Sequence, residues 1–221
     1  MSVLATDDFN RANNADLGAN WTPISDGNSG GDNFTITSNA AVSTGPDAAD
    51  CCEGYTGISW PNDQWSEVTY GTAGADALGA GDGPCVRTVA GTPSTFDYYR
   101  LIASGAGWEL GKFVDGAFTS IASGAGTTWA DGDRAYLEVQ GTTLIVKKNT
   151  TNGAGGTTVT TQTDSSIASG NPGIAHSTSD TASKIDSWQG GDFVAGGTTS
   201  DPIPRMRFYR APRNTSARRP S

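Results

Sequence analysis

The chain has 221 residues, thirty of them glycine, and a formal net charge of −9. This length predicts one domain, with a body large enough to bury a core without metals or a set of disulfides. Many glycines, threonines and serines disfavour helices and favour β-structure. The acidic balance makes nucleic acid an unlikely main ligand of the body, because phosphate binding needs clustered Lys and Arg.

The N-terminal residues read Met-Ser-Val-Leu-Ala-Thr-Asp-Asp and contain no basic n-region and no apolar h-region. They predict no secretory signal, so we expect the protein to be made and kept in a cytoplasm, or to leave it by lysis or a dedicated route. No run of the sequence approaches the roughly 20 apolar residues of a membrane-spanning helix. No membrane partner is therefore expected.

Short segments that alternate apolar and polar residues follow along the chain, separated by Gly, Asn, Asp and Ser clusters. The clearest runs from Arg134 to Lys148, where a turn at 141–142 predicts a hairpin. Its buried face is expected to carry Leu137, Val139, Leu144 and Val146. Other strands are expected at 34–37, 65–70, 96–102, 108–113, 157–162 and 184–188, and loops at 23–33 and 72–84. Ten or more such strands predict an all-β sandwich or barrel.

The three cysteines are Cys51, Cys52 and Cys85. An odd number of cysteines in a chain without a signal peptide does not indicate a framework of disulfide bonds. Neighbouring residues on a strand point to opposite faces, so Cys51 and Cys52 cannot easily hold one metal ion together. We expect buried thiols, with a single bridge from Cys85 to Cys51 or Cys52 as the alternative.

Residues for catalysis are sparse. Two of the four glutamates, Glu109 and Glu138, stand alone on expected strands, whereas glycosidases use a pair of carboxyl groups. Asp131 and Asp133 lie in a turn, where Asp is favoured for backbone hydrogen bonding. The one histidine, His176, has Ser177 beside it on the opposite strand face, so a structural role is predicted. No catalytic residue is assigned, and the chain is not expected to be an enzyme.

The C-terminal part differs in charge from the rest. Residues 1–193 hold eight basic and twenty-two acidic residues, a formal charge of −14, whereas residues 194–221 hold six arginines and one aspartate, or +5. We interpret 1–193 as the domain, 194–204 as a linker and 205–221 as an arginine-rich arm. The expected partner-binding residues are Arg205, Arg207, Phe208, Tyr209, Arg210, Arg213, Arg218 and Arg219. An electrostatic anchor to an acidic neighbour is favoured; a nucleic-acid tail and a solvated tail are the alternatives.

Two N-terminal strings, at 7–12 (Asp-Asp-Phe-Asn-Arg-Ala) and 17–21 (Leu-Gly-Ala-Asn-Trp), resemble the opening of concanavalin A-like lectin/glucanase jelly rolls. They resemble in particular the laminin-G-like domains of bacterial and bacteriophage proteins. Later strings at 99–101, 108–110, 129–133, 173–175 and 185–188 fit the same pattern, so the resemblance covers about residues 4–193. It implies a two-sheet antiparallel jelly-roll sandwich with adjacent first and last strands. It does not fix function, because this fold carries lectins, hydrolases, lyases and structural modules.

The resemblance also implies candidate ligand sites. Jelly rolls of this kind often bind one Ca²⁺ where the first and last strands meet, and Asp7, Asp8 and Asp186 match those positions. The alternative is that these acids cap turns and pair with Arg11 or Lys184. Apart from this Ca²⁺, no cofactor is expected. Sugar binding would use stacked aromatic side chains, for which Trp60, Trp65, Tyr98 and Tyr99 are the candidates. Tyr98 and Tyr99 occupy opposite strand faces, so one of them is expected to be exposed.

These features favour a non-enzymatic structural and interaction module. The family resemblance points to a bacteriophage virion protein of the head-decoration or fibre type, made in the host cytoplasm and anchored by its arm. Its expected partners are other virion subunits, in a homo-oligomer or a larger assembly, and cell-surface glycans. The alternatives are a carbohydrate-binding adhesin and a glycoside hydrolase or polysaccharide lyase.

Overall fold

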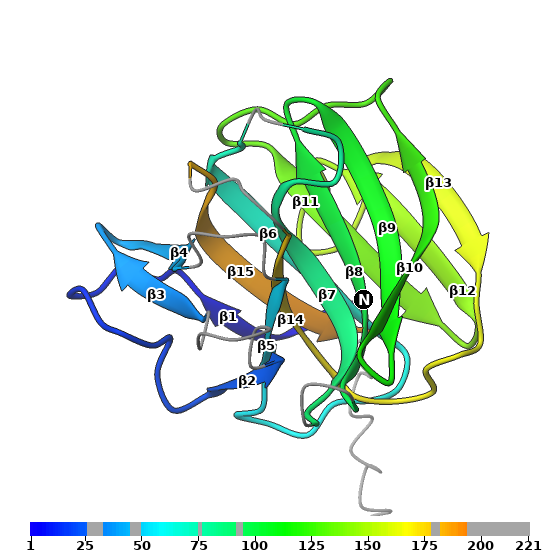
Figure 1. The fold of residues 1–221 in the computed structure, drawn as a ribbon, viewed down its shortest axis with the longest axis horizontal. Coiled ribbons are helices and arrows are strands. Elements are labelled where there is room, and N and C mark those ends of the chain that lie inside the picture. The colour runs from blue at the N-terminus through cyan, green and yellow to red at the C-terminus, as the bar shows by residue number, and fades with distance from the viewer. Residues whose placement is uncertain (26–32, 45–49, 75–76, 92–94, 178–181, 194–221) are drawn as a thin grey trace, which may run out of the picture.

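The computed structural model describes residues 1–25, 33–44, 50–74, 77–91, 95–177 and 182–193. Within these ranges the chain forms fifteen strands and no helix, arranged as two stacked antiparallel sheets (Figure 1). The predicted all-β two-sheet jelly roll is confirmed. No helix in the described part of the chain is long and apolar enough to cross a membrane. The linker at 194–204 and the basic arm at 205–221 lie outside the described residues.

The larger sheet has eight strands. Its order is β13 (Thr157–Thr163), β12 (Thr143–Lys148), β11 (Arg134–Gln140), β6 (Gln64–Thr72), β15 (Lys184–Asp192), β4 (Ala40–Ser43) and β3 (Phe34–Thr37), while β1 (Ser2–Asp7) also pairs with β15. The smaller sheet has seven strands, in the order β10 (Ala117–Gly124), β9 (Gly107–Val114), β8 (Asp97–Ser104), β7 (Gly81–Val89), β14 (Asn171–Ser177), β5 (Cys51–Tyr55) and β2 (Trp21–Ser25).

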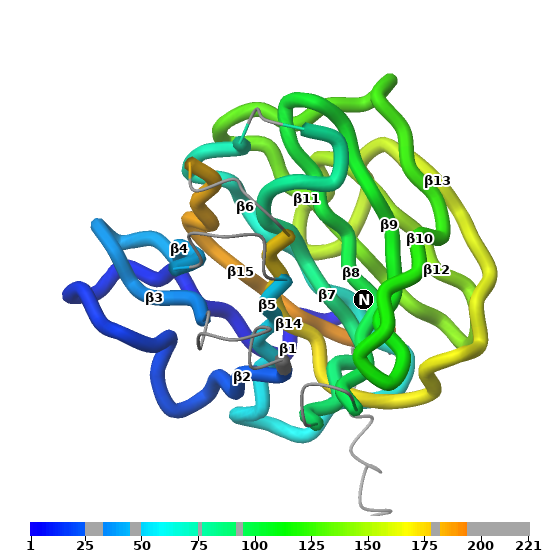
Figure 2. The backbone as a smooth tube through the Cα atoms, viewed as in Figure 1, coloured from blue at the N-terminus to red at the C-terminus, as the bar shows by residue number. Residues whose placement is uncertain are grey.

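The first and last strands are adjacent, as expected. Ser2 pairs with Asp192 and Asp7 pairs with Trp188 in an antiparallel register. Figure 2 shows this neighbourhood as the blue start of the chain running beside the orange β15. The end of the described body therefore lies next to the N-terminal strand.

Strand β7 corrects the expected loop at 72–84, because the strand begins at Gly81. Its first half, Gly81-Asp82-Gly83-Pro84, lacks the alternation that marks strands in the sequence. These residues are nevertheless fully buried between β14 and β8. A Cβ at Gly83 would lie 1.8 Å from the carbonyl oxygen of Leu101, so glycine is needed there for the strands to approach.

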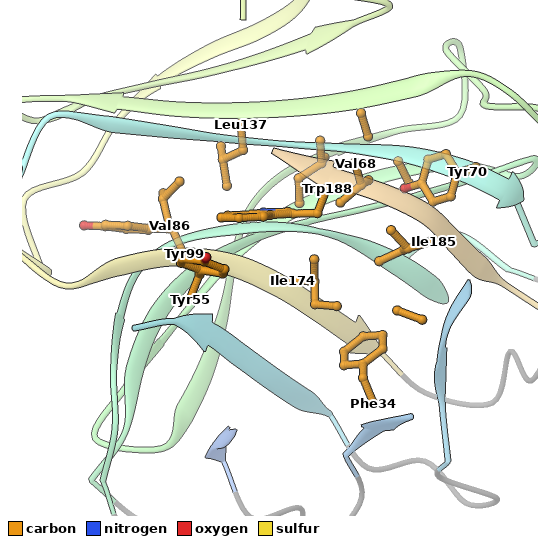
Figure 3. Packing of buried hydrophobic residues seen from close by; sticks show 14 of the residues in the cluster. Phe34, Tyr55, Val68, Tyr70, Val86, Tyr99, Leu137, Ile174, Ile185 and Trp188 are labelled. Atoms are coloured by element: carbon orange, nitrogen blue, oxygen red, sulfur yellow. The ribbon is translucent and has the colours of Figure 1, made fainter. Parts of the chain in front are cut away.

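The core fills the space between the sheets. Side chains from both sheets meet there, including Val68 and Trp188 from the larger sheet and Tyr99 and Ile174 from the smaller one (Figure 3). The hairpin of β11 and β12 has the predicted register, and Leu137, Val139, Leu144 and Val146 are all fully buried. A second buried cluster, which includes Cys52, Cys85, Tyr98 and Ile102, lies on the other face of the smaller sheet.

Candidate functional site

A polar groove crosses four neighbouring strands of the larger sheet, β11, β6, β15 and β1. We call it the sheet groove. Its cavity of about 460 Å³ is lined by Thr6, Asp7, Asp8, Glu67, Thr69, Arg134, Asn152, Ser187, Trp188 and Gln189. On β6, Glu67 and Thr69 alternate with Val68 and Tyr70, which belong to the core. The two-residue period of the strand therefore places Glu67 and Thr69 on the face that points away from the other sheet.

Glu67 forms the centre of the groove floor and is held on both oxygens. Gln189 donates to its Oε1 and Thr150 donates to its Oε2. Arg134 Nε lies 4.0 Å from Oε1. Burial raises the pKa of the Glu67 carboxyl above its usual range, and the hydrogen bonds from Gln189 and the Gly153 amide together with the charge of Arg134 oppose that rise. The carboxyl is a fixed acceptor that shapes the groove.

The loop between β12 and β13 covers one side of the groove and is anchored through Arg134. Arg134 Nη1 donates to the Thr150 carbonyl at 2.7 Å, and the Arg134 amide donates to Asn149 Oδ1 at 2.8 Å. At the tip of the loop, Gly153 has a φ of +73° and packs against the ring of Trp65. The exposed side chain of Asn152 is thereby held over the groove.

Glu138 lies near the groove but is closed to a substrate. It sits on β11 opposite Trp65, while Tyr136 sits opposite Glu67, so the two glutamates are diagonal neighbours on one face. Its Oε2 accepts hydrogen bonds from Tyr136 at 2.6 Å and from Lys147 at 2.9 Å, and it is buried. Glu109 is on β9 of the other sheet, so the two expected strand glutamates are not brought together.

The three candidate calcium ligands do not form one cluster. Asp7 is occupied by Arg11, by the Trp21 indole N–H at 2.9 Å and by the Phe9 amide. Asp8 and Asp186 line a shallow pocket together with Asn10, Asn39 and Ser187. Among the described residues, no group of three or more His, Cys, Asp or Glu side chains is arranged to hold a metal ion. The expected pairing of Asp7 with Arg11 is present, at 2.6 Å.

Three of the four candidate sugar-stacking residues are buried, which corrects the expectation for them. Trp65 is enclosed under Gly153. On β8, Tyr98 lies in the second cluster and Tyr99 lies in the core, so both faces of β8 are covered at these residues. None of these rings can stack on a ligand at the surface. Trp60 is half-buried: its indole N–H donates to the Tyr55 carbonyl at 2.7 Å, and its ring packs edge-on against Trp188.

His176 and the cysteines have structural environments. His176 Nδ1 lies 2.7 Å from Asp82 Oδ1, and both side chains are buried. Cys51 belongs to the main core, whereas Cys52 belongs to the second cluster, as expected for adjacent strand residues. The Sγ atoms of Cys52 and Cys85 lie 3.3 Å apart as free thiols, and burial raises the pKa of Cys52 well above its usual value.

No family model matches the chain, and no curated protein matches it by sequence. Solved structures do match. The carbohydrate-binding module CBM66 from Bacillus subtilis superposes with a TM-score of 0.52 at 15% identity, over 77% of this chain and 93% of the module. The fold is a concanavalin A-like jelly roll.

Two further comparisons support this jelly roll. The Ca²⁺/mannose-bound exoplasmic/lumenal domain of VIP36 has a TM-score of 0.51 at 13% identity, over 81% of this chain and 85% of that domain. The GH43 protein BlXynB (K247S mutant) from Bacillus licheniformis has a TM-score of 0.51 at 10% identity, and the match covers 85% of this chain but 39% of that protein. At these identities the likeness concerns the fold.

Sequence reasoning did not find the sheet groove. Its walls come from four strands that are far apart in the sequence, and only their order in the sheet brings them together. The available signal was the outward-facing polar set on β6, Glu67 and Thr69, between the core residues Val68 and Tyr70. Such a polar pair on a strand is common on solvated sheets, so it does not by itself predict a site.

Proposed function

We propose that this chain is a non-catalytic carbohydrate-binding module whose ligand lies in the sheet groove. The observation that carries the proposal is the lining itself, in which carboxylate, carboxamide, hydroxyl and guanidinium groups surround a cavity of about 460 Å³. Ligand sites in proteins have cavities of roughly 300–1,000 Å³ with a few well-placed polar groups. A sugar ring carries neighbouring hydroxyls that each donate and accept, so this mixed lining suits it.

The polar groups of the groove divide into a fixed set and an available set. Glu67 and Gln189 are bonded to each other and form a rigid floor. Asn152 and Asp8 are exposed at opposite sides of the groove. An Asn carboxamide offers both donors and an acceptor, and a carboxylate offers acceptors. Neighbouring sugar hydroxyls can therefore be bound from both walls while the floor excludes other orientations.

The geometry favours binding over cleavage. Glycoside hydrolysis needs two carboxyl groups that reach the scissile bond from opposite sides. Glu67 is held by Gln189 and Thr150, Asp7 is held by Arg11 and Trp21, and Glu138 does not line the cavity. Asp8 is the one exposed carboxyl of the described lining, so the groove offers a single available carboxyl group rather than a pair.

The module serves, on this proposal, as the displayed domain of a bacteriophage virion protein of the head-decoration or fibre type, made in the host cytoplasm. The support is the family resemblance of the sequence together with the charge division, −14 for residues 1–193 and +5 for residues 194–221. Opposite charges on two parts of one chain suit attachment of the basic arm to an acidic neighbouring subunit. The sheet groove then remains free for a cell-surface glycan.

The test is a glycan array with the full chain, followed by titration calorimetry of the strongest ligand. Asn152→Ala removes an exposed side chain of the groove wall, and we expect it to weaken binding at least about tenfold, the effect of roughly 1.4 kcal/mol. The matched control is Asn62→Ala, another exposed asparagine, which lies outside the groove. An array with no bound glycan, or equal losses in both variants, would contradict the proposal.

A further inference from the structure

A second cavity lies where the described body ends. It has a volume of about 600 Å³ and is lined by Pro61, Asn62, Asp63, Asp192 and Phe193. We call it the terminal pocket. Asp192 is the last residue of β15, and Asp63 directly precedes β6, the strand that pairs with β15. The strand pairing therefore places two carboxyl groups beside an aromatic ring.

We propose that the terminal pocket of one copy of this chain binds the basic segment 205–210 of a second copy. The proposal extends the attachment role of the arm and does not depend on glycan binding in the sheet groove. It assigns the acidic neighbour of the arm to the body of the same protein, so that the chain assembles with itself.

One carboxylate oxygen of a pocket residue has no hydrogen-bond donor in the described part of the chain. The Oδ1 atom of Asp192 is buried and receives no hydrogen bond from any described residue. A buried carboxylate oxygen without a donor is unfavourable, whereas a bound cation would satisfy it. Asp63 has an exposed side chain, and its Oδ1 accepts the Gly141 amide at 2.8 Å.

The nearest described cation does not fill this role. Arg87 Nη2 lies 3.7 Å from Asp63 Oδ1, but the guanidinium donates to three carbonyl oxygens, those of Asn62, Ile167 and Gly141. It partly offsets the charge of Asp63, and within the described part of the chain it donates no hydrogen bond to Asp192 Oδ1. The pocket therefore remains suited to a further guanidinium, which binds carboxylates through paired hydrogen bonds. The half-buried ring of Phe193 offers it a face to stack on.

The basic segment supplies matching chemistry. Residues 205–210 read Arg-Met-Arg-Phe-Tyr-Arg, so arginines alternate with large apolar or aromatic side chains. The pocket adjoins β1, whose Ser2 pairs with Asp192 and whose Val3 and Leu4 are exposed. From Val3 to Asp7, β1 pairs with β15 alone among the described strands, so this part of β1 can take an added strand. Arginines can enter the pocket while Met206 and Phe208 contact the exposed apolar residues of β1.

We favour a second copy over the same chain as the source of the bound segment 205–210, because of the sequence that connects this segment to the body. Phe193 is itself a wall of the pocket, and only residues 194–204 separate it from Arg205. Pro202 and Pro204 stand just before the basic segment, and proline disfavours helical backbone at the residue that precedes it. We therefore expect the connection to lead away from its own pocket and toward an adjacent subunit.

The experiment measures the mass of the full chain by light scattering over a range of concentrations and at two salt concentrations. We expect a mass that rises above that of one chain at 0.1 M salt and falls at 1 M, because contacts between the exposed Asp63 and the arginines weaken as the screening length drops from roughly 10 Å to about 3 Å. Asp192→Asn should weaken self-association at least about tenfold, because it removes the charge that pairs with a buried guanidinium. Replacing Arg205, Arg207 and Arg210 with Gln should abolish it.

The matched control is Asp115→Asn, which removes one negative charge from the exposed β9–β10 turn and should leave association unchanged. Cross-linking of mixed isotope-labelled and unlabelled chains should join segment 205–210 to the terminal pocket between copies. A chain that stays monomeric at all concentrations would overturn the proposal, as would cross-links confined within one copy. Glycan binding by the Asp192→Asn variant should match that of the wild type, which separates this proposal from the function of the sheet groove.

Discussion

At the scale of single residues, two buried ionisable side chains, Arg87 and Glu53, form hydrogen bonds to backbone groups of distant segments. Arg87, with a φ of +53°, ties three segments together through the carbonyl oxygens of Asn62, Gly141 and Ile167. Glu53 on β5 reaches the other sheet, where its Oε1 accepts the Phe34 amide at 2.9 Å. Each side chain links parts of the chain that the sheet hydrogen bonds do not join.

Replacing Arg87 with Ala should destabilise the body by about 3 kcal/mol or more, because three hydrogen bonds from a charged donor are lost together. Arg87→Lys should recover only part of this, since an ammonium group cannot span three carbonyl groups in one plane. Urea unfolding followed by tryptophan fluorescence measures both. Equal stability of the wild type and the Ala variant would show that the three segments are held by other contacts.

Glu53 makes stability depend on pH. Burial raises its pKa from 4.5 to about 7, against the opposing hydrogen bond from Phe34. The folded state therefore holds this proton more tightly than the unfolded state, and stability falls as pH rises from about 4.5 to about 7. Glu53→Gln removes the titration, so its stability relative to the wild type should rise by up to about 3 kcal/mol across this range. If the unfolding free energies of the wild type and of Glu53→Gln changed with pH in the same way, this would contradict the role of Glu53.

The residue scale also shows where sequence reasoning failed. The alternation at 96–102 correctly placed Tyr98 and Tyr99 on opposite faces of a strand, and it predicted that one of them is exposed. Both are buried, because the smaller sheet has apolar clusters on both of its faces. The two-residue period shows which face of the strand a side chain lies on, but it does not show whether other residues cover that face.

At the scale of elements, local patterns predicted the strands well wherever one face alternates regularly. The hairpin of β11 and β12 has the expected turn and buried face, because its register follows from neighbouring residues alone. The start of β7 and the sheet groove could not be predicted. The first depends on the close approach of β8 to Gly83, and the second depends on the order β11-β6-β15-β1.

The loop between β12 and β13 is the element on which the sheet groove most depends. Gly153 has a φ of +73°, and a Cβ there would lie 3.0 Å from the Trp65 ring. Gly153→Ala should therefore cost about 1–2 kcal/mol and loosen the loop. Hydrogen exchange should show faster exchange at residues 150–154, with β14 unaffected as an internal control. Unchanged protection of the loop would show that its position does not depend on this glycine.

At the scale of the whole molecule, the described body is a two-sheet jelly roll with a polar groove on the larger sheet and an acidic pocket beside its last strand. The groove and the pocket share no lining residue, although Gln189 of the groove and Asp192 of the pocket both belong to β15. The two proposed binding sites therefore use different residues of the body, and variants of one can be tested separately from variants of the other.

The most direct measurement is a chemical-shift map of the isotope-labelled full chain, titrated with the strongest glycan from the array. We expect the largest shifts on the amides around the sheet groove, including Thr69, Asn152 and Gln189, and on the indole N–H of Trp188 beneath it. Residues of the terminal pocket, such as Asn62 and Phe193, should not shift. Shifts centred on the smaller sheet, with the groove unaffected, would contradict the account.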